Sequence, residues 1–296
     1  MSEQTPQPTI AEAIREAADA LRAGGVREAR REAGSLLAHS LGRDRAYLFT
    51  HDDERLTVET AARFRAFVSR RAAGEPLQYI TGRQEFYGLD FEVTPDVLIP
   101  RPETELLVET ALELMKGTEA PRFCDIGTGS GCISVALLHE RRDARGVGAD
   151  ISPAALRVAA RNAERHGVSD RLELRESDCF DAWRGDDEAT RRRFHVVVSN
   201  PPYVAEADLE GLQREVREHE PRVALTPGGD GLSVVRRLVS ESPRHLEPGG
   251  HLLFEIGFNQ HEQVACLIEA RVWALLDIHR DLQGIPRTVA LRLNGG

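Results

Sequence analysis

Three glycines interrupt the run Phe123-Cys124-Asp125-Ile126-Gly127-Thr128-Gly129-Ser130-Gly131-Cys132, which begins as an apolar strand and continues into the helix-like residues 133–140. Glycine lets a backbone approach a ligand closely, and the start of a helix offers free N–H groups. A dinucleotide-binding loop requires glycine or alanine at the position that Cys132 occupies here. The run therefore predicts a strand, a ligand-binding turn and a helix, with a ligand other than a nicotinamide dinucleotide.

An acid follows the next apolar run, Gly146-Val147-Gly148-Ala149. A carboxylate at a strand tip about twenty residues beyond such a loop can bind both hydroxyls of a ribose. Asp150 holds that position, and Ser152-Pro153 after it is typical of a helix start. Two interpretations of Asp150 stay open, namely a ribose ligand and a charge that only stabilises the helix N-terminus.

The larger part of the chain alternates strand and helix patterns, which predicts an α/β fold with a doubly wound sheet. Alternation favours parallel strands, whereas the last two patterns, with only residues 281–286 between them, favour an antiparallel pair. The seven expected strands are 122–126, 145–149, 171–175, 195–199, 251–256, 274–279 and 288–293.

The first part of the chain shows helical periodicity instead. A capping-box pair, Thr9 and Glu12, precedes the first apolar repeat, and further repeats end before glycines. Residues 78–93 suggest a β-hairpin, and prolines follow it. The expected organisation is a small N-terminal helical domain over 1–76, a β-hairpin and linker over 77–98, and the α/β domain over 99–296.

A second motif, Asn200-Pro201-Pro202-Tyr203, follows the apolar run 194–199. Prolines restrict the residue before them and donate no N–H, so the turn presents acceptors beside the flat ring of Tyr203. Acceptors of this kind can grip the hydrogens of a planar NH2 group and stabilise the positive charge that develops as its nitrogen attacks. The alternatives are an ordinary proline turn at a strand end and a tyrosine that only anchors it.

Composition excludes several classes of function. The 296 residues carry 38 basic and 48 acidic side chains, a net charge of −10. That balance disfavours a protein that binds chiefly through phosphate contacts. The four cysteines form no metal-ligand or disulfide pattern, so no metal is expected. Because neither a signal peptide nor a long apolar segment is evident, we expect no membrane partner and a cytoplasmic location. We also expect a monomer.

These motifs together resemble the release-factor glutamine methyltransferases, and the resemblance covers most of the chain. The Pro100-Arg101-Pro102-Glu103-Thr104-Glu105 run separates this family from methyltransferases of DNA adenine and ribosomal guanine, which share the Asn-Pro-Pro-Tyr turn. Further matching segments are Glu75-Pro76-Leu77-Gln78-Tyr79-Ile80-Thr81-Gly82, Phe86-Tyr87-Gly88, Ser177-Asp178, Glu220-Pro221-Arg222 and Gly228-Gly229-Asp230-Gly231-Leu232.

The resemblance implies a seven-stranded Rossmann-like methyltransferase sheet with S-adenosylmethionine as cofactor and S-adenosylhomocysteine as product. The expected cofactor-binding residues are Gly127, Thr128, Gly129, Ser130, Gly131, Asp150, Asp178, Cys179 and Asn200. Asp178 and Cys179 would lie near adenine, and Arg101 and Glu103 over the cofactor. For Asp125, help in binding the cationic cofactor and ordering of the loop stay open.

The resemblance also implies the substrate. The methyl acceptor is the side-chain amide nitrogen of the glutamine in the Gly-Gly-Gln motif of bacterial peptide-release factors, with no direct nucleic-acid specificity. The expected catalytic residues are Asn200, Pro201 and Tyr203, and the substrate-binding residues are Asn200, Pro201, Pro202 and Tyr203. The N-terminal domain either recognises the substrate or covers the fold.

Two departures from the family pattern and two other functions remain. Cys179 stands where relatives often carry a larger side chain, and residues 184–193 look like a charged, solvated insertion. The first alternative function is an N6-adenine or N2-guanine nucleic-acid methyltransferase, which needs the same NH2 chemistry. The second is a cofactor-binding module without activity, against which the intact acceptor turn argues.

Overall fold

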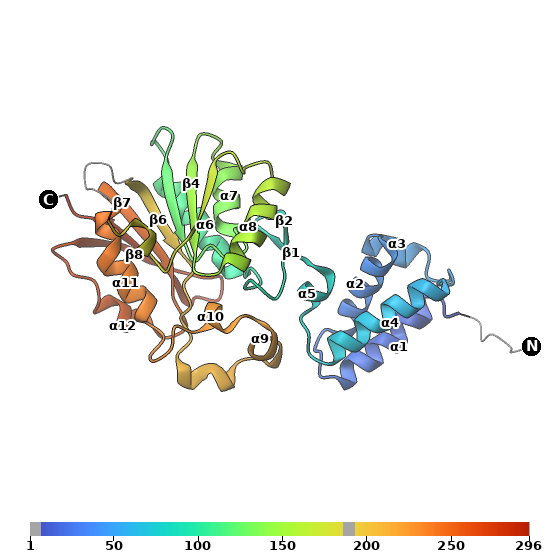
Figure 1. The fold of residues 1–296 in the computed structure, drawn as a ribbon. Helices are drawn as coiled ribbons and strands as arrows, with labels where there is room; N and C mark the ends of the chain where they lie inside the picture. The colour runs from blue at the N-terminus through green and yellow to red at the C-terminus, as the bar shows by residue number, and fades with distance from the viewer. Residues whose placement is uncertain (1–6, 186–192, 296) are drawn as a thin grey trace, which may run out of the picture. The chain divides into compact units, whose positions relative to one another are not determined.

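The computed structural model describes residues 7–185 and 193–295, so most of the predicted charged insertion lies outside the described residues. The chain divides into two compact units. The first comprises the residues up to Gly82 together with Gln213–His219, and the second comprises Arg83–Leu212 and Glu220–Gly296. Figure 1 traces the chain through both units. In the described residues no helix is both long and apolar enough to cross a bilayer.

The first unit is a helical bundle. Its first helix begins with the predicted capping box, in which Thr9 Oγ1 accepts from Glu12 N (3.2 Å) and the Glu12 carboxylate accepts from Thr9 N (2.9 Å). The buried faces of three longer helices form one apolar core, as the periodicity predicts. The helices are α1 (Ile10–Ala23), α2 (Ala29–Leu41), α3 (Arg45–Thr50), α4 (Val58–Ala72) and α5 (Leu77–Thr81).

A distant segment of the chain completes this bundle. The short helix α9 (Arg214–His219) belongs to the first unit, and its Glu215 pairs with the largely buried Arg71 of α4 at 2.7 Å. Arg71 also pairs with Glu32 of α2. The segment 213–219 thus closes an ion-pair network in a unit that lies more than a hundred positions earlier in the sequence. Nothing in the sequence pattern predicted this return.

A seven-stranded sheet forms the centre of the second unit, in the order β5-β4-β3-β6-β7-β9-β8. Strands β3 to β7 of this sheet are parallel. Strand β9 is antiparallel to both β7 and β8, which confirms the expected ending. The strands are β3 (Arg122–Ile126), β4 (Arg145–Asp150), β5 (Leu172–Glu176), β6 (Phe194–Ser199), β7 (Leu246–Glu255), β8 (Trp273–Arg280) and β9 (Pro286–Leu293).

Helices cover both faces of the sheet, which confirms the doubly wound fold (Figure 1). Neighbouring residues on a strand point to opposite faces, so Phe123 packs in one core and Cys124 in the other. The helices around the first core are α6 (Glu105–Leu114), α7 (Cys132–Glu140) and α8 (Pro153–Arg165); those around the second are α11 (Ser233–Glu241) and α12 (His261–Ala265).

The predicted hairpin consists of β1 (Arg83–Phe86) and β2 (Leu89–Glu92). It starts later than the pattern suggested, because 77–81 form the helix α5. Asn162 of α8 ties the hairpin to the glycine loop, since its amide bonds Glu92 N, Glu92 O and Ser130 O at 2.8–3.0 Å. The remaining short elements are η1 (Pro102–Thr104), η2 (Asp181–Trp183), η3 (Glu206–Gly211), α10 (Arg222–Leu225) and η4 (Ser242–Arg244).

Candidate active site

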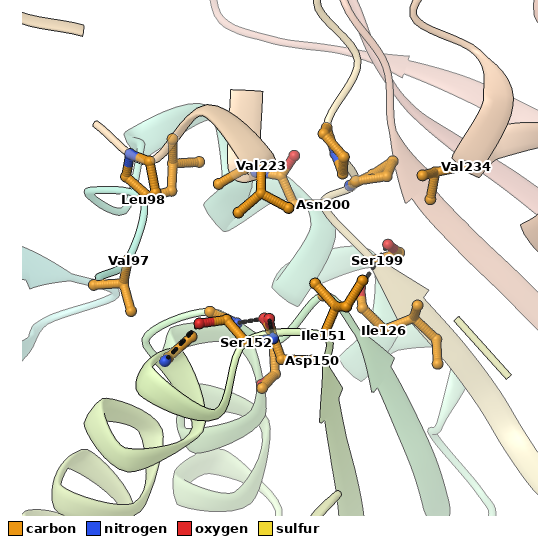
Figure 2. Close-up of a pocket in the computed structure, with 18 of the residues that line it drawn as sticks. Val97, Leu98, Ile126, Asp150, Ile151, Ser152, Ser199, Asn200, Val223 and Val234 are labelled. Atoms are coloured by element: carbon orange, nitrogen blue, oxygen red, sulfur yellow. Dashed lines mark hydrogen bonds between the residues drawn. The ribbon is translucent and has the colours of Figure 1, made fainter. Parts of the chain in front are cut away.

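A cavity of about 460 Å³ opens at the carboxyl ends of the central strands, and all the residues that line it belong to the second unit. Ligands bind at this edge of open α/β sheets, in pockets of roughly 300–1,000 Å³. The strand register brings the motifs together here, because Ile126 of β3 pairs with Ala149 of β4 on one side and with Ser199 of β6 on the other. In Figure 2, Asp150, Ile151 and Ser152 lie across the cavity from Asn200 and Val223.

The glycine loop passes along the cavity floor. Gly127 and Gly129 have φ angles of 75° and 55°, in the left-handed region that favours glycine. The N–H groups of Gly127 and Thr128 both donate to Ala149 O, at 2.8 and 2.9 Å, which fastens the loop to β4. Gly131 lies behind the lining as the N-cap of α7, where an added Cβ would come 3.1 Å from Ala159 Cβ.

Asp125 is fully buried beneath the loop and does not line the cavity. Its Oδ2 accepts hydrogen bonds from the hydroxyls of Thr128 and Ser134, both at 2.8 Å. Burial raises the pKa of this carboxyl to about 6, and the nearby Asp150 charge adds to the shift. These contacts favour the loop-ordering interpretation of Asp125 over direct contact with a ligand.

Asp150 faces the cavity from the tip of β4 (Figure 2). Its Oδ2 accepts from Gly129 N at 2.8 Å and its Oδ1 from Ser152 N at 2.9 Å. A carboxylate has about four acceptor positions, so these two bonds leave capacity for the hydroxyls of a ribose. Burial raises the pKa of Asp150. Ser152 also caps α8 as predicted, through Ala155 N at 3.2 Å.

Asp178 and Cys179 line the adjoining wall. The Asp178 carboxylate pairs with Arg237 of α11 at 2.6 Å, and Arg237 lines the cavity as well. Cys179 has a φ of 48°, unusual for a residue other than glycine, and its carbonyl accepts from the Ser177 hydroxyl at 2.8 Å. Burial raises the pKa of the Cys179 thiol to about 12, so this thiol is neutral.

The Asn200-Pro201-Pro202 segment closes the cavity beside the glycine loop. The Ser199 hydroxyl donates to Ile126 O at 2.7 Å and joins the start of the turn to the end of β3. Asn200 Nδ2 donates to Thr104 Oγ1 at 3.0 Å. Within the described part of the chain, no protein group donates a hydrogen bond to Asn200 Oδ1.

Tyr203 lies behind the turn rather than in the cavity wall. Its hydroxyl donates to Glu255 at 3.1 Å, and its carbonyl accepts from Gln260 Nε2 at 2.9 Å. An added Cβ at Gly231 would come 2.4 Å from Tyr203 O, so only glycine fits against the turn there. These contacts support the interpretation of Tyr203 as the anchor of a rigid turn.

The proline-rich run before η1 supplies another part of the cavity rim. Arg101 lines the cavity and pairs with the buried Glu220, whose other oxygen accepts from Ile99 N at 3.1 Å. Two motifs far apart in the sequence, around Arg101 and around Glu220, are therefore joined at this rim. Glu103 lies outside the cavity lining.

Of the predicted site residues, Glu103, Asp125, Gly131 and Tyr203 do not line the cavity, and all the others do. Sequence reasoning missed two buried polar residues next to Asn200, namely Thr104 and Glu255. A signal for Glu255 existed, because an acid at the end of an apolar strand pattern is the same feature that singled out Asp150. Thr104 stood inside a quoted motif, but no pattern linked it to the turn.

Both units match known family models. Residues 12–82 match the PrmC N-terminal domain, and residues 102–272 match the methyltransferase small domain. The sheet order, the glycine loop and the second match define a Rossmann-like methyltransferase that depends on S-adenosylmethionine. The cavity fits this cofactor in size, in the absence of side chains at Gly127 and Gly129, and in the acceptor capacity of Asp150.

The particular family follows from full-length relatives. The chain is 47% identical over 283 residues to the release factor glutamine methyltransferase of Cereibacter sphaeroides, an alignment that covers 96% of this chain and 98% of that protein. This chain belongs to the release factor glutamine methyltransferase family.

Two solved structures are similar to parts of this chain. A release factor-specific protein-(glutamine-N5) methyltransferase from Alicyclobacillus acidocaldarius is 32% identical, covering 69% of this chain and 99% of that one, with a TM-score of 0.42. The hMettl16 catalytic domain, in complex with the MAT2A 3'UTR hairpin 6, is 16% identical, covering 77% and 81%, with a TM-score of 0.52. The second likeness concerns the fold alone.

Proposed function

We propose that this protein transfers a methyl group to the side-chain amide nitrogen (N5) of the glutamine in the Gly-Gly-Gln motif of peptide chain release factors. The observation that carries the proposal is the Asn200 side chain, which lines the cavity with its Nδ2 bonded to Thr104. Its Oδ1 is left as an acceptor for an N–H of the substrate carboxamide. The relatives are release factor glutamine methyltransferases, which supports the release factor as substrate.

The proposed role of the chain is to position the substrate. An amide nitrogen is a poor nucleophile because its lone pair is delocalised, so alignment and charge stabilisation supply much of the rate. The rigid turn at Asn200, Pro201 and Pro202 holds the carboxamide against the cavity that would receive the cofactor. When bound, S-adenosylmethionine supplies an electrophilic methyl group.

We assign no general base to this reaction. The nitrogen becomes strongly acidic once it is methylated, and water can accept its proton. The Tyr203 hydroxyl is unsuited to that task, because burial raises its pKa above the ordinary value for tyrosine and its proton is directed at Glu255. Positioning of the substrate carboxamide by Asn200 is therefore the main catalytic contribution that we propose for this turn.

The domain roles follow as part of the same proposal. The first unit recognises or holds the release factor, and the second unit, which contains the whole cavity lining, carries out the transfer. Because a release factor works at the ribosome, we propose that the protein acts in the cytoplasm as a monomer, without direct specificity for nucleic acid.

A direct experiment tests the proposed substrate. The purified protein is incubated with methyl-labelled S-adenosylmethionine and a release factor, and the modified residue is located by tandem mass spectrometry. A release factor with alanine in place of the motif glutamine is the control, and DNA and ribosomal RNA are offered in parallel. Label on the glutamine supports the proposal, whereas label only in nucleic acid assigns the protein to the alternative class.

A further inference from the structure

The buried carboxylate of Glu255 has no role in the proposed reaction. Glu255 ends β7 with 2% of its surface exposed. Its Oε2 accepts from the Thr104 hydroxyl at 2.7 Å, and its Oε1 accepts from the Tyr203 hydroxyl at 3.1 Å. The strand register explains its place, because Ser199 of β6 pairs with Phe254 of β7 and so sets Glu255 beside the turn. Both partners of this carboxylate belong to sequence motifs of the cavity.

Thr104 links Glu255 to the substrate-facing asparagine. The Thr104 side chain is buried, and its oxygen lies 2.7 Å from Glu255 Oε2 and 3.0 Å from Asn200 Nδ2. A hydroxyl group has one proton to donate. Because a carboxylate only accepts, that proton goes to Glu255, and Thr104 meets Asn200 only as an acceptor. The NH2 side of the Asn200 amide must therefore face Thr104.

The opposite orientation of the amide is penalised. With the amide turned over, Asn200 Oδ1 would face the lone pairs of the Thr104 oxygen without a proton between them. The NH2 group would then point into the cavity, where it could not accept a hydrogen bond from a carboxamide N–H. A buried acceptor left without a donor is destabilising, because it has lost its hydrogen bonds to water without a replacement. The contacts of Glu255 and Thr104 thus decide which face of Asn200 a substrate meets.

We propose that Glu255 and Thr104 are positioning residues that lock the Asn200 amide with Oδ1 toward the substrate and that disfavour aspartate at position 200. The inference rests on the proposed function, since it assumes a substrate that donates an N–H to Asn200. It gives a physical reason for the presence of the 100–105 run and the Asn-Pro-Pro-Tyr turn in one chain. Aspartate at position 200 would place a second carboxylate beside the Thr104 hydroxyl, whose single proton cannot be donated to both carboxylates.

The first test removes the Thr104 hydroxyl and keeps the shape of the side chain. Thr104→Val should lower kcat for release-factor methylation by about tenfold or more, with an unchanged Kd for S-adenosylmethionine, because the amide loses its fixed orientation. Thr104→Ser keeps the hydroxyl and should retain kcat within about threefold. Equal losses in the two folded variants, or wild-type kcat in Thr104→Val, would overturn the proposal.

The second test moves the negative charge along the network. Glu255→Gln alone should change kcat only slightly, because the oxygen of the new amide still accepts from Thr104 while its NH2 group faces Tyr203. Asn200→Asp should lose about a hundredfold or more in kcat. In the double variant, the new glutamine side chain turns and donates to Thr104, which frees the Thr104 proton for the new aspartate. The double variant should therefore exceed Asn200→Asp alone by about tenfold, and losses that simply add would contradict the network.

A spectroscopic measurement separates this inference from the proposed substrate. The side-chain NH2 signals of Asn200, identified by their loss in Asn200→Ala, should show one proton protected from exchange in the wild-type protein without any substrate. Thr104→Val should remove that protection and Thr104→Ser should keep it. Protection that persists in Thr104→Val would contradict the positioning role of Thr104. A wild-type protein that shows the protection but does not methylate release factors would contradict only the proposed function.

Discussion

At the scale of single residues, the site depends on how each polar group is paired. Asn200 lines the cavity with its donor side bonded to Thr104, whereas Asp125 is buried with one oxygen bonded to two hydroxyls. Asp150 lies between these extremes, with two backbone partners and spare acceptor capacity. The same functional group therefore has different roles in this site according to which of its lone pairs are already used.

Removal of the acceptor tests the role of the turn. Asn200→Ala should lower kcat more than a hundredfold, because one preorganised contact to developing charge is typically worth about 2.7–4 kcal/mol. The cofactor should stay bound, since the main cofactor contacts are expected from the glycine loop and Asp150. Turnover with release factor and a binding titration with S-adenosylmethionine measure the two effects. A folded variant that turns over at the wild-type rate would show that the catalytic acceptor lies elsewhere.

The two interpretations of Asp150 make different predictions for binding. Asp150→Ala should weaken S-adenosylmethionine binding by about 1–3 kcal/mol through loss of a charged acceptor for ribose. Ser152→Ala is the matched control, because it removes the cap of α8 and leaves the carboxylate in place. Calorimetry on both variants decides the question. Equal weakening in the two would mean that Asp150 only stabilises the helix N-terminus.

Asp125 should make the stability of the cofactor-free protein depend on pH. Its pKa is about 6 in the folded protein and its ordinary value is 3.8, so between these values the folded state binds the extra proton and stability falls as pH rises. Asp125→Asn lacks this proton. Between pH 5 and pH 8, the free energy of unfolding of Asp125→Asn, relative to that of the wild type, should rise by about 1–2 kcal/mol. Urea unfolding at the two pH values measures the difference, and a constant difference would refute the shifted pKa.

At the scale of elements, the sheet brings together what the chain separates. The parallel pairing of β3 with β4 and β6 places the glycine loop, Asp150 and Asn200 at one edge. The α8 helix then holds two of these parts in place, because its buried Asn162 bonds both the hairpin and the glycine loop. The hairpin therefore contributes to the site through the loop that it supports.

This bridging asparagine gives a prediction for α8. Asn162→Ala leaves Glu92 N, Glu92 O and Ser130 O without their buried partner, so the free energy of unfolding should fall by about 2–4 kcal/mol. The neighbouring Arg161 also bonds Glu92, but through exposed side chains. Arg161→Ala should therefore cost less than about 1 kcal/mol. Urea unfolding of both variants compares them, and similar losses would contradict the bridging role.

At the scale of the whole molecule, the chain builds two units that are not consecutive in sequence. Residues 213–219 leave the second unit shortly after the acceptor turn and complete the first unit through Glu215 and Arg71. All the residues that line the cavity remain in the second unit. A change confined to the first unit should therefore affect substrate recognition more than cofactor binding.

Arg71 allows this separation to be measured. Arg71→Leu leaves Glu32 and Glu215 without their shared, largely buried cation, and should destabilise the first unit by about 1–3 kcal/mol. We expect a higher KM for release factor and an unchanged Kd for S-adenosylmethionine. Arg22→Ala, which breaks an exposed ion pair in the same unit, should change neither value. A weakened cofactor affinity in Arg71→Leu would contradict the division of roles.

The amino-acid sequence by itself determined the features that depend on local pattern. Apolar alternation indicated the strands, the three glycines indicated the turn before α7, and the prolines indicated the rigid turn at Asn200. These features follow from backbone restrictions and side-chain periodicity over a few residues. The parallel pairing of the central strands and the antiparallel ending were accessible as well, through the lengths of the connections between strands.

Only the tertiary structure decided which distant polar groups meet. Thr104 and Glu255 are 151 positions apart and Thr104 and Asn200 are 96 apart, yet they form one hydrogen-bond network. The return of residues 213–219 to the first unit is of the same kind. A single sequence carries no periodic signal for such pairs. Their contact is fixed by sheet order and strand register, which bring the tips of β6 and β7 side by side.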